Sequence, residues 1–153
     1  MNKVKVGIIG SGFIANHHCY AYSLLPNVEM IGIASNNKEE AKSLMNKYDI
    51  ADNFFDNYKD LLKLDCDAIS MCVPNNLHKE IACDVLNSGK HALVEKPLAR
   101  NIREASEMLD VEASSNRTIF YCENNMYAPS FSKVKEIIKE GALGVIYMGR
   151  GKE

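Results

Sequence analysis

The chain has 153 residues, of which 46% are hydrophobic and 25% charged, the composition of one globular domain with a buried core. A net charge of −2 and a pI near 6.1, without a cluster of basic residues, argue against a nucleic-acid or membrane-surface partner. No run of about 18 apolar residues could span a bilayer, and the five cysteines form no CxxC pair. We therefore expect a cytoplasmic protein with reduced cysteines and no metal site.

Strand-like and helix-like segments alternate along the chain. The apolar start leads into a glycine turn, which indicates a first strand and not a signal peptide. The sequence predicts strands over residues 3–10, 28–35, 53–55, 67–73, 91–95, 117–123 and 144–150. It predicts helices over residues 13–25, 37–48, 56–63, 77–87, 101–114 and 129–140. Short connections in such a pattern indicate right-handed crossovers, so we expect a doubly wound α/β domain with a mostly parallel, Rossmann-type sheet.

Polar residues mark where several of these helices should begin. Asn37 precedes a helix whose first turn carries glutamates, which the helix dipole favours. Asp56 is expected to open the short helix that follows. Asn101 and Glu104 have the spacing of a capping box at the start of a later helix.

A glycine-rich turn, GSGFIA, follows the first predicted strand. Gly10 would allow the tight turn, Gly12 would let a pyrophosphate approach the backbone, and the small Ala15 would pack the helix against its strand. The backbone amides at the start of the helix, at Phe13 and Ile14, would face the phosphates. Because the motif stands between the first strand and the first helix of an alternating pattern, it predicts a dinucleotide site.

The end of the second predicted strand bears on which dinucleotide is bound. Ser35 stands where an acidic residue commonly holds the ribose hydroxyl of NAD. Ser35, Asn36 and Lys38 could instead receive a 2′-phosphate, with the lysine supplying positive charge. This pattern favours NADP over NAD. NAD stays open, because Lys38 would equally serve as a solvated side chain and no arginine is present to bind a phosphate in two places.

Three segments in order, GSGFIA, VPNNLH and GKHALVEKPLA, resemble motifs of the glucose–fructose oxidoreductase / inositol dehydrogenase (Gfo/Idh/MocA) family. The resemblance covers essentially the whole chain. It implies an NAD(P)-dependent oxidoreductase acting on a sugar, a polyol or a related hydroxy or keto compound. It also implies a nucleotide-binding domain over residues 1–122. Residues 123–153 would then form a connecting helix and the first strand of a C-terminal α/β substrate domain that is missing.

The resemblance implies a cofactor-binding role for the VPNNLH segment. Val73, Pro74 and Asn75 would lie at the end of the fourth strand, beside the ribose and pyrophosphate. From the residues alone, Asn75 or Asn76 is also a plausible helix cap, and the two roles can coexist.

The sequence suggests different roles for His78 and for the pair His17 and His18. His78 would join the cofactor contacts by resemblance, although on its own it reads as a half-exposed packing residue. His17 and His18, early in the first helix, have no evident partner, so we expect them to be structural.

The EKP segment carries the expected chemistry. The resemblance implies that Lys96 lies beside the nicotinamide and that Glu95 orients the ribose or the lysine. Oxidation of a secondary alcohol needs a group that takes the hydroxyl proton while hydride leaves carbon. A lysine in a partly dehydrated cleft would release its own proton more easily than in water. We therefore expect Lys96 to be the catalytic proton donor and acceptor; the alternative is a surface Glu–Lys pair.

The segment YCENNMYAPSF resembles the part of the family that enters the active site. Asn124 would contact the nicotinamide ribose, whereas Met126 stands where members often carry an arginine. The chain ends where the substrate domain should begin, so alone it would hold a cofactor without positioning a sugar and would be inactive. It would also expose apolar surface suited to self-association. The alternative function is a non-catalytic nucleotide-binding or sensing module.

Overall fold

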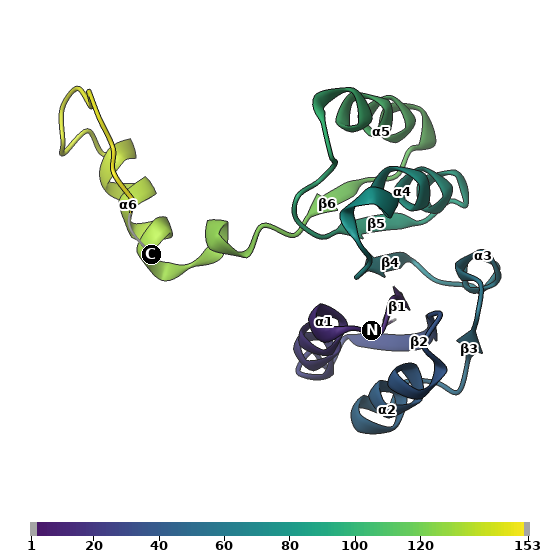
Figure 1. Ribbon diagram of the computed structural model, residues 1–153. Coiled ribbons are helices and arrows are strands. Elements are labelled where there is room, and N and C mark those ends of the chain that lie inside the picture. The colour runs from purple at the N-terminus through teal and green to yellow at the C-terminus, as the bar shows by residue number, and fades with distance from the viewer. Residues whose placement is uncertain (1–2, 152–153) are drawn as a thin grey trace. The chain divides into compact units, whose positions relative to one another are not determined.

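The computed structural model describes residues 3–151 (Figure 1). The chain divides into two compact units, Met1–Cys122 and Glu123–Glu153.

Over residues 3–122 the described chain forms one parallel sheet of six strands, in the order β3-β2-β1-β4-β5-β6. The strands are β1 (Val4–Ile9), β2 (Val28–Ala34), β3 (Phe54–Phe55), β4 (Ala68–Met71), β5 (His91–Val94) and β6 (Ile119–Tyr121). The connecting elements are α1 (Phe13–Ser23), α2 (Lys38–Tyr48), α3 (Tyr58–Leu61), the 3-10 turn η1 (Asn75–Leu77), α4 (His78–Asn87) and α5 (Ile102–Ser115). This is the doubly wound Rossmann order, as the alternating sequence predicts.

Helices cover both faces of the sheet (Figure 1). Ile8 of β1 packs with residues of α1 and α2, and the next residue, Ile9, packs on the opposite face with residues of α3, α4 and α5. Successive strand side chains point to opposite faces, so a strand covered on both sides needs apolar side chains on both of them. The strand β4 is buried along its whole length and is apolar except for Ser70.

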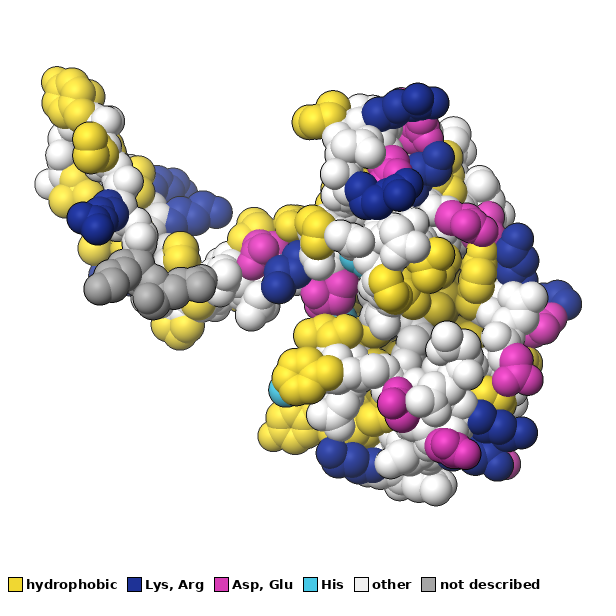
Figure 2. Space-filling view, viewed as in Figure 1, with side chains coloured by type: hydrophobic (Ala, Val, Ile, Leu, Met, Phe, Trp, Pro, Cys, Tyr) yellow, Lys and Arg dark blue, Asp and Glu magenta, His cyan; other side chains and the backbone are white. Residues whose placement is uncertain are grey.

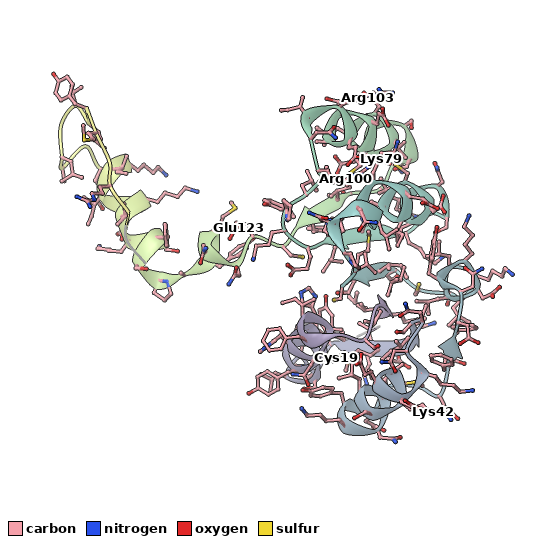
Figure 3. All side chains as sticks on the ribbon, in the orientation of Figure 1. Cys19, Lys42, Lys79, Arg100, Arg103 and Glu123 are labelled. Carbon is pink, nitrogen blue, oxygen red and sulfur yellow. The ribbon has the colours of Figure 1, made fainter. Side chains whose placement is uncertain are left out.

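The five cysteines are all free in the structure. Cys19 of α1, labelled in Figure 3, is fully buried in the core between this helix and the sheet. Burial raises the pKa of its thiol to about 11, which leaves this thiol uncharged and poorly nucleophilic at neutral pH. Cys19 therefore acts as a small core residue.

The helix starts match the sequence only in part. The Asn37 side chain accepts a hydrogen bond from the Glu40 amide, and the Asn101 side chain accepts one from the Glu104 amide, as predicted. Asn57, and not Asp56, caps α3. The prediction that an asparagine of VPNNLH caps the following helix is wrong, because the chain enters the turn η1 from Pro74 and no side chain caps it.

The second unit contains the 3-10 turn η2 (Asn124–Tyr127) and the helix α6 (Pro129–Lys139). The predicted strand over residues 144–150 is wrong, since no strand occurs between residue 123 and residue 151. A strand needs a neighbour to satisfy its backbone hydrogen bonds, and this unit offers none within its described residues. Several hydrophobic side chains are exposed on this unit (Figure 2). Three of them, Phe131, Val134 and Ile138, belong to α6, and their spacing puts them on one side of that helix.

No helix in the described part of the chain is long and apolar enough to cross a membrane.

Candidate functional site

A cleft lies at the carboxyl ends of β1, β2 and β4. It has a volume of about 520 Å³ and is lined by Ile9, Gly10, Ser11, Gly12, Ala34, Ser35, Asn36, Asn37, Glu40, Asp56, Tyr58, Cys72, Val73, Pro74, Leu77, Glu80 and Ile81. The chain order reverses between β1 and β4, which are neighbours in the sheet. In open α/β sheets ligands bind at such a switch point, outside the carboxyl ends of the strands. The cleft therefore stands where the glycine motif predicts it.

The glycine turn is tight at Gly10 and open at Gly12. Gly10 has a φ of +99°, and a Cβ at this position would lie 2.2 Å from the carbonyl oxygen of Cys72. At Gly12, by contrast, a Cβ would meet nothing within 4 Å, so the space in front of it is open. Gly12 is also the N-cap of α1, and no side chain caps this helix. Its first backbone amides therefore have no side-chain cap, and uncapped helix starts of this kind can bind anions.

The close contact between helix and strand rests on Ala15. This residue is fully buried in the core shared by α1, α2 and the sheet. A larger side chain would push α1 away from β1, so the small third residue of the motif has the packing role that the sequence predicts.

Polar contacts join the glycine turn to the end of β2. The Ser11 and Ser35 hydroxyl oxygens lie 2.8 Å apart, and the Ser35 hydroxyl accepts a hydrogen bond from the Asn37 amide at 3.0 Å. Ser11 also donates towards a Glu40 carboxylate oxygen at 3.4 Å. Both serines are buried. Their hydroxyls hold the two loops together across the cleft.

The charged lining of the cleft is acidic. Glu40, Asp56 and Glu80 contribute carboxylates, and no lysine, arginine or histidine is among the described residues that line it. Tyr58 also lines the cleft and donates to Asp84 at 2.7 Å. Burial, followed by the Asp84 contact, raises the pKa of the Tyr58 phenol, so this hydroxyl stays a neutral donor.

A buried hydrogen-bond network leads from α1 to the EKP segment. The His18 Nδ1 lies 2.7 Å from the Ser70 hydroxyl, and His18 Nε2 lies 2.9 Å from a Glu95 carboxylate oxygen. Tyr22 donates to the Ser70 hydroxyl at 3.1 Å, and burial raises the pKa of the Tyr22 phenol. Ser70 can then donate its own proton to Nδ1, which leaves Nε2–H facing Glu95. The other Glu95 oxygen accepts the Lys96 amide at 3.1 Å.

This network supplies the partners that the sequence did not reveal for His18, and its role is the structural one expected. The side chains of His18 and Glu95 are only 15% and 13% exposed, so their contact is largely shielded from water. His18 fixes the carboxylate that in turn holds the backbone at Lys96. The partners lie 52 and 77 residues along the chain, and the sequence gives no signal for them.

His78 ties two loops of the site together. It is 1% exposed, not half-exposed as the sequence suggests, and its ring nitrogens face the carbonyl oxygens of Pro97 at 2.9 Å and Val73 at 3.0 Å. Both nitrogens thus lie within hydrogen-bond distance of main-chain oxygens, and a neutral ring donates to one of them at a time. The ring connects the end of β4 with Pro97, which follows a cis peptide bond.

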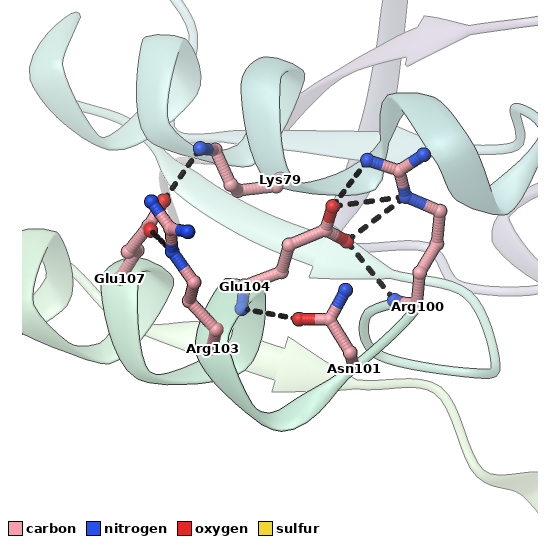
Figure 4. A network of polar contacts seen from close by, with 6 residues as sticks. All are labelled: Lys79, Arg100, Asn101, Arg103, Glu104 and Glu107. Carbon is pink, nitrogen blue, oxygen red and sulfur yellow. Dashed lines mark hydrogen bonds and ion pairs between the residues drawn. The ribbon is translucent and has the colours of Figure 1, made fainter.

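The segment that follows Lys96 is anchored by charge (Figure 4). Glu104 of α5 accepts hydrogen bonds from the Arg100 amide and guanidinium, and the guanidinium lowers the pKa of the Glu104 carboxyl. The expected capping box is therefore shifted: Asn101 caps α5, but Glu104 reaches back to Arg100. Nearby, Lys79 of α4 and Arg103 of α5 both bind Glu107.

Comparison with known proteins decides the family. Residues 4–123 match the model of the Gfo/Idh/MocA oxidoreductase family, described as an NAD-binding Rossmann fold. The chain belongs to this family.

Its similarity to Gfo/Idh/MocA members extends along nearly all its length. Levoglucosan dehydrogenase of Pseudarthrobacter phenanthrenivorans is 31% identical over 99% of this chain and 41% of its own. D-glucoside 3-dehydrogenase of Escherichia coli is 30% identical over 96% of this chain and 42% of its own. A levoglucosan dehydrogenase structure in complex with NADH superposes with a TM-score of 0.86 at 30% identity, covering 94% of this chain and 41% of that one. The chain spans about two fifths of these relatives.

The cleft of this Gfo/Idh/MocA domain contains several of the predicted cofactor-binding residues. They are Gly10, Gly12, Ser35, Asn36, Val73 and Pro74. Other predicted residues are not among its lining residues: Phe13, Ile14, Lys38, Asn75, His78, Glu95 and Lys96. Asn124 belongs to the second unit.

For two of these residues, Lys38 and Lys96, the structure shows where the side chain lies instead of in the cleft. The Lys38 ammonium lies over the Phe54 ring, 5.6 Å from its centre. Lys96 is exposed, so the partly dehydrated cleft expected around it is not formed by the described residues. Sequence reasoning in turn missed Glu40, whose position three residues after the cap Asn37 reads as that of an ordinary capping glutamate.

Proposed function

We propose that this chain is the nucleotide-binding portion of an NAD(P)-dependent oxidoreductase that acts on a sugar, a polyol or a related hydroxy or keto compound. The observation that carries the proposal is the cleft at the switch point, where the open face of Gly12 meets the uncapped start of α1. The substrate class is supported by the relatives, which are dehydrogenases of levoglucosan and of D-glucosides. Residues 1–122 would be the nucleotide domain, and residues 123–153 would lead to a substrate domain.

The residues present fit a dinucleotide. The turn from Gly10 to Gly12 and the first amides of α1 would hold the pyrophosphate. The end of β2, at Ser35 and Asn36, would receive the adenosine ribose, and Val73 with Pro74 would line the other side of the cleft. The bound nicotinamide would supply the site that accepts or donates the hydride.

In this proposal Lys96 moves the proton. When a secondary alcohol is oxidised, the C–H bond breaks with its electron pair as hydride, the O–H bond loses its proton, and a carbonyl forms. The neutral Lys96 amine would take that proton, and in the reverse direction its ammonium would return one. Glu95, held by His18, would fix the Lys96 backbone by accepting its amide hydrogen. A substrate domain would have to enclose the exposed Lys96 side chain for this transfer to be efficient.

Calorimetric titration of the 153-residue chain with NADH and, separately, NADPH tests the nucleotide site. Saturable binding of at least one of them, weakened in Gly12→Ala, is expected. Absence of binding by both, with the chain folded by circular dichroism, would overturn the proposal.

The role of Lys96 is tested in the product of the intact gene that contains this chain. Lys96→Ala should lose turnover of the sugar or polyol substrate while keeping NADH affinity, because the side chain acts on a proton and not on cofactor binding. Lys79→Ala is the matched control, since Lys79 binds Glu107 on the helix surface away from the cleft. Equal turnover in Lys96→Ala and the unaltered protein would refute the assignment.

The exposure of Lys96 favours a second candidate, a non-catalytic module that binds or senses the dinucleotide. It predicts nucleotide binding by the chain and no dehydrogenase turnover by the intact gene product. The two experiments above therefore separate the candidates.

A further inference from the structure

The end of the cleft next to β2 carries a carboxylate that the sequence motif does not predict. Glu40, in the first turn of α2, lines the cleft together with Ser35, Asn36 and Asn37. One of its oxygens lies 3.4 Å from the Ser11 hydroxyl in the glycine turn. The carboxylate thus stands between the phosphate-binding turn and the end of β2, where a dinucleotide presents its adenosine ribose.

Glu40 is not engaged as a helix cap. In a capping box, the third helical residue would reach back to the amide of Asn37. Here that amide donates to the Ser35 hydroxyl at 3.0 Å instead. The Glu40 side chain is directed to the cleft side, towards Ser11, and remains exposed there to a ligand.

The positive charge expected to bind a 2′-phosphate, that of Lys38, does not line the cleft. The Lys38 ammonium lies over the Phe54 ring and is not part of the described cleft lining. The Ser35 hydroxyl, the other expected phosphate ligand, is buried between Ser11 and the Asn37 amide. The two further carboxylates of the lining, Asp56 and Glu80, add to the negative potential. These carboxylates would repel the additional 2′-phosphate of NADP, which carries a charge of about −1.5 to −2.

We propose that Glu40 selects NAD over NADP. Its carboxylate accepts a hydrogen bond from the 2′-hydroxyl of the adenosine ribose, and it repels the 2′-phosphate that replaces this hydroxyl in NADP. The proposal rests on the dinucleotide function proposed above and deepens it. It reverses the preference for NADP that the residues after β2 suggest.

The test compares three proteins, the unaltered 153-residue chain, Glu40→Gln and Glu39→Gln, in titrations with NADH and NADPH at low salt. Glu39 is the matched control, because it lies in the same helical turn and is exposed but does not line the cleft. The unaltered chain should bind NADH at least tenfold more tightly than NADPH. Glu40→Gln should bind NADPH about tenfold more tightly than the unaltered chain does, a change of about 1.4 kcal/mol, and NADH more weakly. Glu39→Gln should leave the ratio unchanged.

The outcomes separate this proposal from the one it rests on. If neither dinucleotide binds the folded unaltered chain, the nucleotide function itself fails and the role of Glu40 fails with it. If NADH or NADPH binds but the ratio is the same in Glu40→Gln, the selection by Glu40 is refuted and the nucleotide function stands. A preference of the unaltered chain for NADPH would refute it equally.

Discussion

The two glycines of the turn between β1 and α1 should respond differently to substitution by alanine: Gly10→Ala should lower stability, whereas Gly12→Ala should lower NADH affinity. Gly10→Ala puts a Cβ at a φ of +99° and 2.2 Å from the Cys72 carbonyl oxygen, which belongs to the backbone and cannot rotate away. The unfavourable backbone conformation costs about 1–3 kcal/mol, and the overpacking costs a further ~1–3 kcal/mol. We therefore expect a loss of about 2–6 kcal/mol in the free energy of unfolding, a large part of the ~5–15 kcal/mol of a typical domain.

Gly12→Ala should affect binding and leave stability nearly unchanged. The new Cβ meets nothing within 4 Å, and Gly12 has a φ of −73°, which alanine adopts freely. Alanine is a poorer N-cap than glycine, but it restricts the unfolded chain, so the net change should stay within about 1 kcal/mol. Because the Cβ occupies the open space in front of α1, NADH affinity should fall at least tenfold, or about 1.4 kcal/mol.

Urea denaturation followed by circular dichroism measures the first effect, and calorimetric titration with NADH measures the second. For Gly10→Ala, a loss near 4 kcal/mol corresponds to a melting temperature lower by roughly 10–20 °C for a domain of this size. The reasoning would be refuted if Gly10→Ala were within 1 kcal/mol of the unaltered chain, or if Gly12→Ala lost stability and kept its NADH affinity.

Two further predictions concern the polar contacts around the site. His18→Ala should lower the free energy of unfolding by about 1–3 kcal/mol, because it leaves the mostly buried Glu95 carboxylate without its imidazole partner. The control His17→Ala, at an exposed position, should change the free energy of unfolding by less than about 0.5 kcal/mol. Equal losses in the two variants, measured by urea denaturation, would contradict the role of the network. Arg100 lowers the pKa of Glu104 in the folded state, so this contribution to stability is complete above the usual carboxyl range of about 4–5 and is lost as the pH falls through the lower folded-state value. Urea melts between about pH 2 and 7 should show a shallower acid loss in Glu104→Gln, and an unchanged pH dependence would count against the pair.

The sequence by itself determined the architecture and predicted where the cleft beside the glycine turn lies. Alternating apolar segments of strand and helix length allow few arrangements, because each strand must bury both faces and parallel strands need a crossover. Gly10, Gly12 and Ala15 predict a tight turn between β1 and α1 of the kind that binds phosphates, since each has a local steric reason that holds wherever such a turn occurs. The predicted strand over residues 144–150 is the exception: a strand exists only beside a partner, and its residues alone do not supply one.

Only the tertiary structure decided how the polar side chains are used. His18 and Glu95 lie 77 residues apart in the chain, and they meet because α1 packs against the sheet and Glu95 directly follows β5. In the sequence, Glu40 has the position of a capping residue that would accept the Asn37 amide. In the structure this amide donates to the Ser35 hydroxyl, and the Glu40 side chain faces the cleft. Local patterns are fixed by backbone sterics and burial, whereas side-chain partners depend on which of several donors and acceptors the packed fold brings within about 3 Å.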